Sequence, residues 1–183
     1  MIQSFASVAA GVPTVVVGSI FQKEPQVFIA HPDQGFDKFE DLKKSPAIFV
    51  SKDGLASYYQ WLKAEHGFRE EQVKPYTFNA QPFLADKKSV MQGYLSSEPY
   101  LIEKTAGFKP VVFLLADQGF DTYSTTIDTR LELIQQKPDV VKRFIEASII
   151  GPCATEEEAA LGLVLHLAEI QWSRHSKSEG DAS

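Results

Sequence analysis

The stretch FVSKDGLASYYQWL, residues 49–62, contains the pattern that decides the fold. It begins at the end of AIFV, residues 47–50, a short apolar run typical of a buried strand. Residues 53–67 then carry apolar side chains at i, i+3, i+4 and i+7, which predicts a helix with one apolar face made by Leu55, Tyr58, Tyr59 and Leu62. The junction between strand and helix is Ser51-Lys52-Asp53-Gly54. The stretch therefore predicts a strand–turn–helix unit.

The same alternation continues along the chain. Apolar or alternating runs predict strands at 14–21, 26–31, 73–78, 94–97, 110–116 and 122–129. Helical periodicity predicts helices at 2–10, 37–44, 83–93, 98–107, 129–136 and 138–150. The continuous β-branched run at 14–21 predicts a strand buried on both faces. Strands alternating with helices predict an α/β sandwich with a mostly parallel sheet.

Composition narrows the class of protein. The 183 residues suit one domain or two small lobes, and 44% apolar with 23% charged residues is typical of a globular chain. The net charge of −6 and the lack of a basic face argue against nucleic acid as a partner. One cysteine, Cys153, excludes an internal disulfide and a multi-cysteine metal site. The start lacks the basic region of a signal peptide, and Gly11 and Pro13 interrupt its apolar run.

The junction from Ser51 to Gly54 has two interpretations. Ligands of open α/β sheets bind beyond the carboxyl ends of strands, and a helix start there offers N–H groups and partial positive charge to an anion. Gly54 would let a ligand approach the backbone. Ser and Asp are also frequent helix caps, so the local pattern alone favours plain capping.

A second candidate is YLSSEPY, residues 94–100. A carboxylate at Glu98 would suit an amine or a pyrimidine donor, and Tyr100 follows two residues later. The alternative is that Glu98 only stabilises the positive end of its helix, by about 0.3–1 kcal/mol, and the local pattern favours this alternative. Tyr58 is interpreted as a core residue because helical spacing of aromatics usually marks a core. The four histidines lack metal-ligand spacing, and the sequence has no G-x-S-x-G motif and no obvious Ser/His/Asp series. No metal, cofactor or catalytic residue is therefore predicted.

Four segments taken together resemble a known family: IQSFASVAAGVPTVVVGSIFQKEPQVFIAHP (2–32), FEDLKK (39–44), VSKDGLASYYQWLKAEHG (50–67) and GYLSSEPYLIEK (93–104). They resemble, in order and spacing, the substrate-binding proteins of ABC importers. The resemblance is to the nitrate/sulfonate/taurine and thiamine-pyrimidine-precursor type, the SsuA-like proteins. PVVFLLA and KPDVVKRFIEAS follow as in that family, so the resemblance covers about residues 2–151.

The resemblance implies a type II periplasmic-binding-protein-like α/β fold with two lobes of mostly parallel sheet, the first lobe incomplete. Its expected parts are 1–30 (rest of the first lobe and a hinge strand), 31–117 (second lobe), 118–151 (return to the first lobe) and 152–183 (a divergent tail, helical and then disordered). Chain crossings are expected near 22–32 and 116–125. Ligand-binding residues carried over from the family are Ser51, Lys52, Asp53, Gly54, Glu98 and Tyr100.

The function implied by the resemblance is solute binding without catalysis. The expected solute is a sulfonate, a nitrate- or taurine-like anion or a thiamine pyrimidine precursor, delivered to an ABC permease in the membrane. The full-length family is periplasmic or lipid-anchored, whereas this chain shows no signal peptide. The chain opens inside the first lobe and departs from the family after residue 151, so we expect a truncated member that binds weakly alone and self-associates. The alternatives are a non-functional remnant and a relative of thiamine-pyrimidine biosynthesis enzymes, whose cysteine-rich iron site a single cysteine does not support.

Overall fold

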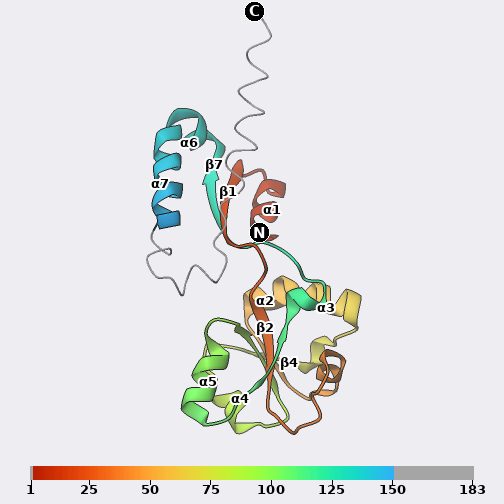
Figure 1. Cartoon of the computed structure of the whole chain (residues 1–183). Helices are drawn as coiled ribbons and strands as arrows, with labels where there is room; N and C mark the ends of the chain where they lie inside the picture. The colour runs from red at the N-terminus through yellow and green to blue at the C-terminus, as the bar shows by residue number, and fades with distance from the viewer. Residues whose placement is uncertain (1, 151–183) are drawn as a thin grey trace, which may run out of the picture. The chain divides into compact units, whose positions relative to one another are not determined.

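The computed structural model describes residues 2–150 and divides the chain into two compact units (Figure 1). Unit 1 takes the chain up to Lys23 and from Thr122 onward, and unit 2 is Glu24–Asp121. Both boundaries lie inside the ranges predicted for the chain crossings. The predicted tail at 152–183, with Cys153, lies outside the described residues.

Unit 2 is built on a five-stranded mixed sheet in the order β4-β3-β5-β2-β6. The strands are β2 (Gln26–Ala30), β3 (Ile48–Val50), β4 (Val73–Pro75), β5 (Val90–Tyr94) and β6 (Val111–Leu114). β3 is parallel to β4 and β5, while β2 is antiparallel to both β5 and β6. Four strands therefore point one way and β2 points the other. This confirms the predicted α/β class with a mostly parallel sheet, as in type II periplasmic-binding-like folds.

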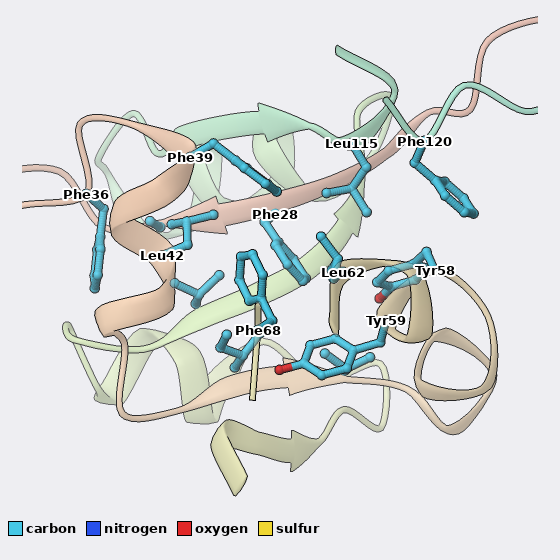
Figure 2. Close-up of a cluster of buried hydrophobic side chains, with 14 residues drawn as sticks. Phe28, Phe36, Phe39, Leu42, Tyr58, Tyr59, Leu62, Phe68, Leu115 and Phe120 are labelled. Carbon is cyan, nitrogen blue, oxygen red and sulfur yellow. The ribbon is translucent and has the colours of Figure 1, made fainter. Parts of the chain in front are cut away.

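Helices cover both faces of this sheet, as the burial of every residue of β2 requires, since successive side chains point to opposite faces. They are η1 (Phe39–Lys44), α2 (Lys52–Ala56), α3 (Tyr58–His66), η2 (Glu70–Gln72), α4 (Gln81–Ala85), α5 (Glu98–Ala106) and η3 (Leu115–Gln118). Phe28 and Ala30 enter one core cluster with η1 and α3, which Figure 2 shows. Val27 and Ile29 enter the other cluster, with α4 and α5. All five residues of β2 are buried, so the predicted hinge strand belongs to the sheet of unit 2.

The helix predicted at 53–67 is interrupted. Ser57 separates α2 from α3 with φ −119° and ψ −103°. Its hydroxyl donates to the carbonyl oxygen of Asp53 at 2.7 Å, the local hydrogen bond by which serine competes with regular helix. The predicted end of this helix at residue 67 is confirmed, because Gly67 ends α3 in the left-handed conformation at φ 71°.

The helix predicted at 83–93 is wrong, and so is the strand at 94–97. The chain instead forms α4, a turn, and then β5 at the centre of the sheet. Asp86 makes the turn, since its Oδ1 accepts from Lys88 N at 3.0 Å and its carbonyl accepts from Ser89 N at 3.0 Å. Residues 95–97 follow β5 as a turn. Leu, Lys, Met and Gln favour helices intrinsically, but pairing with β2 and β3 overrides that preference.

Unit 1 contains α1 (Ile2–Ala9), β1 (Thr14–Phe21), β7 (Ser124–Arg130), α6 (Leu131–Gln136) and α7 (Pro138–Ile150). β1 and β7 form an antiparallel pair with a register shift between Val16 and Gly18. Most of β1 is only half-buried, so the prediction that both its faces are buried is wrong for the described residues. The reason is that the described sheet of this unit has two strands.

Candidate functional site

The candidate residues gather at one edge of the sheet of unit 2. Because four strands run the same way, their carboxyl ends share that edge, the usual place for ligands in α/β sheets. Ser51 follows β3, Tyr76 follows β4, and Glu98 begins the helix after β5. The antiparallel β2 starts there with Gln26, whose Nε2 donates to the carbonyl of Gly93 at 2.8 Å. The two junctions predicted from the sequence thus lie on a common edge.

Ser51 caps α2. Its backbone is extended, with φ −68° and ψ 161°, and its Oγ accepts from Gly54 N at 3.1 Å. The carbonyl of Ser51 accepts from Leu55 N at 2.9 Å. The capping interpretation is therefore confirmed, and ligand binding at Ser51 stays a prediction.

The backbone of Ser51 is also tied to Gln92 of β5, a residue that the sequence prediction missed. Gln92 Oε1 accepts from Ser51 N at 2.6 Å and from the Tyr58 hydroxyl at 2.7 Å. Gln92 is only 6% exposed. Assigning residues 83–93 to a helix hid this partner, because it removed the strand that aligns Gln92 with the end of β3. The turn signal ADKKS, at 85–89, was the clue to β5.

Tyr58 is a core side chain, as predicted, and it explains Gly54. Its ring contacts Phe28 and Phe120 edge-on, with centroids 6.1 and 6.2 Å away. Burial raises the pKa of Tyr58 well above its ordinary value. A Cβ on Gly54 would lie 2.5 Å from the Tyr58 hydroxyl oxygen. The glycine is thus required by a buried ring, and the prediction that it opens the backbone to a ligand is not needed to explain it.

Lys52 and Asp53 are the exposed part of this junction. Within residues 2–150, neither side chain makes a hydrogen bond or an ion pair. The first N–H groups of a helix also lack intrahelical partners. The junction therefore has a fixed inner side, Ser51 and Gly54, and an outer side with a free cation and a free carboxylate.

Glu98 is held by its own turn. Its Oε2 accepts from Tyr94 N at 2.7 Å. A Cβ added to Gly93 would lie 3.0 Å from the Glu98 Cβ, so the two residues are packed closely. Burial and, to a smaller extent, the nearby Glu98 carboxylate raise the pKa of Tyr76. Tyr76 is therefore a neighbour of Glu98 that the sequence prediction missed. Tyr100 is 63% exposed, with Lys104 Nζ 5.7 Å from its ring centroid.

The two junctions lie on opposite faces of the sheet. Tyr58, the neighbour of Ser51 and Gly54, packs in the cluster of Phe28. Glu98 lies beside Gly93, where an added Cβ would also meet Ile29 of the other cluster. Among the described residues, no hydrogen bond or ion pair joins Glu98 or Tyr100 to residues 51–54. The structure brings them to one edge and does not bring them into contact.

A shallow hollow lies elsewhere on unit 2, lined by Trp61, Glu65, His66, Gln118 and Gly119. His66 Nε2 lies 3.2 Å from the Gln118 carbonyl, so this ring holds η3 in place. None of the predicted ligand residues lines the hollow. In the part of the chain that the structure describes, no three His, Cys, Asp or Glu residues are placed to hold a metal, and no helix is long and apolar enough to cross a membrane.

Comparison with known proteins identifies the family. Residues 1–152 match the family described as NMT1/THI5 like. The comparison with curated proteins gives no match. The family match agrees with the resemblance found in the sequence, that to SsuA-like nitrate, sulfonate and thiamine-precursor binding proteins, and it supports a role in binding a small molecule. Because the match spans most of the chain and the sheet has the expected type II-like arrangement, this chain belongs to the NMT1/THI5-like family.

Proposed function

We propose that this protein is the solute-binding component of an ABC importer, which binds a small organic solute without chemical conversion and presents it to a membrane permease. The observation that carries the proposal is the junction from Ser51 to Gly54. It lies at the carboxyl edge of the sheet, its inner side is fixed by Gln92, and the Lys52 and Asp53 side chains are free. A rigid backbone with unpaired polar groups beside it is suited to recognition.

The contacts of the histidines support binding over catalysis. His31 Nε2 lies 2.9 Å from the Phe83 carbonyl, and His66 Nε2 lies 3.2 Å from the Gln118 carbonyl. A nucleophilic mechanism that uses a histidine base needs that histidine within reach of a hydroxyl or thiol. In the described part of the chain, both histidines instead hold backbone segments in place.

The proposed solutes are a sulfonate, a nitrate- or taurine-like anion and a thiamine pyrimidine precursor. Lys52 supplies positive charge for an anion, and Glu98 supplies an acceptor for an amine or an aminopyrimidine. Tyr100, 63% exposed and two residues after Glu98, offers a ring face for stacking. By the same proposal, the protein works outside the cytoplasmic membrane, where such binding components meet their permeases.

A ligand panel tests the proposal. Nitrate, methanesulfonate, taurine and a thiamine pyrimidine precursor would be screened by thermal shift and then by isothermal titration calorimetry. We expect saturable binding of at least one of them. Lys52→Ala should weaken binding of the anions, and Glu98→Gln should weaken binding of the pyrimidine precursor. Lys142→Ala in unit 1 is the charge-matched control. If no member of the panel binds saturably, the proposed function is wrong.

A further inference from the structure

The side-chain amide of Gln92 has a fixed orientation. Its Oε1 accepts two hydrogen bonds, from Ser51 N at 2.6 Å and from the Tyr58 hydroxyl at 2.7 Å. A backbone N–H only donates, so the atom facing Ser51 N must be the oxygen. The –NH₂ group of Gln92 is therefore on the other branch of the amide, with two donor hydrogens.

These two donors have no acceptor among residues 2–150. Gln92 is 6% exposed, and buried polar groups are nearly always hydrogen-bonded. Among the described residues, the only fully buried side-chain polar atom without a partner is Thr14 Oγ1. Gln92 Nε2 thus keeps contact with solvent, and because Gln92 Oε1 is bonded to Ser51 N, just after the end of β3, that contact lies near the carboxyl edge of the sheet.

The hydroxyl of Ser51 adds a third donor. Its Oγ accepts from Gly54 N at 3.1 Å, and its own proton has no acceptor in the described part of the chain. Ser51 is 7% exposed and is bonded through its backbone directly to Gln92. Two neighbouring, largely buried side chains thus have unused donors. A group made only of acceptors, such as a carboxylate or a sulfonate, is complementary to them.

We propose that the Gln92 amide, together with the Ser51 hydroxyl, binds a carboxylate or sulfonate group of the solute. This inference rests on the proposed function and assigns the binding of that group to residues of unit 2. Tyr58 is a positioning residue, because it holds Oε1 and thereby turns the –NH₂ group outward. Lys52, exposed and adjacent to Ser51, adds positive charge beside the donors.

The test follows the Gln92 –NH₂ resonances of the full ¹⁵N-labelled chain by NMR. Acetate and methanesulfonate are the probes, since each is little more than the acceptor group itself. Sodium chloride controls for ionic strength, and methylammonium chloride, which carries donors only, controls for the type of group. We expect a saturable shift of the Gln92 –NH₂ signals with acetate or methanesulfonate, the tighter of the two identifying the group, and no saturable shift with either control.

A near-isosteric substitution provides the second arm. Gln92→Glu keeps an oxygen for Ser51 N and Tyr58 and replaces the –NH₂ group with an acceptor, so binding of both probes should fall by about tenfold or more. Gln60→Glu, on the exposed face of α3, is the matched control and should bind as the unmodified chain does. If Gln92→Glu lowers stability, the –NH₂ signals of the unmodified chain still test whether Gln92 binds the acceptor group.

The outcomes separate this inference from the proposed function. If a solute of the panel binds while the Gln92 –NH₂ signals stay unmoved by acetate and methanesulfonate, the inference is overturned and the proposed function stands. Unchanged affinity for the probes in a folded Gln92→Glu variant overturns it as well. If no panel solute and neither probe binds, both fail.

Discussion

The two strand-to-helix junctions of unit 2 look alike in sequence and differ in what holds them. Ser51 caps α2 after β3, and Glu98 begins α5 after β5. Ser51 is tied through its backbone to Gln92, 41 residues away, whereas Glu98 closes on Tyr94, four residues away. The first junction is fixed by the sheet and the second by its own turn. Substitutions at the first should therefore affect the whole unit, and those at the second should stay local.

Gln92→Leu should have the largest effect. It removes the acceptor of Ser51 N and of the Tyr58 hydroxyl and leaves both buried donors unpaired, which should lower the free energy of unfolding by about 2–4 kcal/mol. Chemical denaturation measures the loss. The exposed counterpart Gln60→Leu should change stability by less than about 0.5 kcal/mol. Equal losses in the two variants would show that Gln92 does not hold the Ser51 junction.

Gly54→Ala comes next. The added Cβ would lie 2.5 Å from the Tyr58 hydroxyl oxygen and 2.8 Å from two ring carbons, and the ring is held by its packing. We expect a loss of about 1–3 kcal/mol from overpacking, measured by thermal and chemical unfolding. Adding Tyr58→Phe, which removes the closest atom, should cost less than the sum of the two single changes. Strict additivity would mean that the ring does not limit this position.

Glu98→Ala should have a smaller effect. It removes one hydrogen bond to Tyr94 N at a half-exposed site and a favourable charge at a helix start, so the loss should be about 1 kcal/mol. Glu98→Gln retains an acceptor and should recover part of that loss. A loss as large as that of Gln92→Leu would break the distinction between a local and a sheet-fixed junction.

Alkaline pH should separate the junctions through their tyrosines. Burial raises the pKa of Tyr58 well above 10.0, and burial together with the Glu98 charge raises the pKa of Tyr76. A raised folded-state pKa gives stability that is fully present below the unfolded pKa near 10.0 and is lost as pH rises toward the folded value. Tyr58→Phe should therefore flatten the fall in stability above pH 10 more than Tyr76→Phe does, as denaturation between about pH 9 and 11.5 would measure. A larger change with Tyr76→Phe would contradict this ordering.

Tyr59 also contributes to the loss of stability at alkaline pH, and it serves as a reference for the two junction tyrosines. Its pKa is raised to about 12, first by burial and then by Glu70 and Glu71. Tyr59 belongs to neither junction, since its hydroxyl donates to the Arg69 carbonyl at 2.8 Å. Tyr59→Phe should flatten the alkaline response independently of changes at Gly54 or Glu98.

The sequence predicts elements whose signals are local. The helix ends at Lys44 and Gly67 and the start of α5 at Glu98 all follow from neighbouring residues, and the structure has them. The sequence does not predict β5, because Met91 and Gln92 by themselves favour a helix. Their pairing with β2 and β3 overrides that preference, and the segment itself carries no signal of that pairing. The helix starts near Ser51 and at Glu98 are therefore predictable, whereas the strand before Glu98 and the role of Gln92 are not.

The candidate site likewise combines local contacts, which the sequence predicts, with contacts between distant residues, which it does not. Ser51 was predictable as a cap because capping depends on residues three positions apart. The role of Gly54 was not, because it depends on the position of the Tyr58 ring. Nor does the sequence indicate that Glu98 and Ser51 lie on opposite faces, since that depends on how β5 pairs and on which face each helix covers.

The central claim is that solute binds at the edge of the sheet where Ser51 follows β3. Mapping amide chemical shifts of the ¹⁵N-labelled chain during titration with a solute that binds in calorimetry tests it most directly. We predict that the largest changes fall on residues 51–54 and on the Gln92 side chain. Changes confined to the hollow of Trp61, His66 and Gln118, with residues 51–54 unmoved, would contradict it.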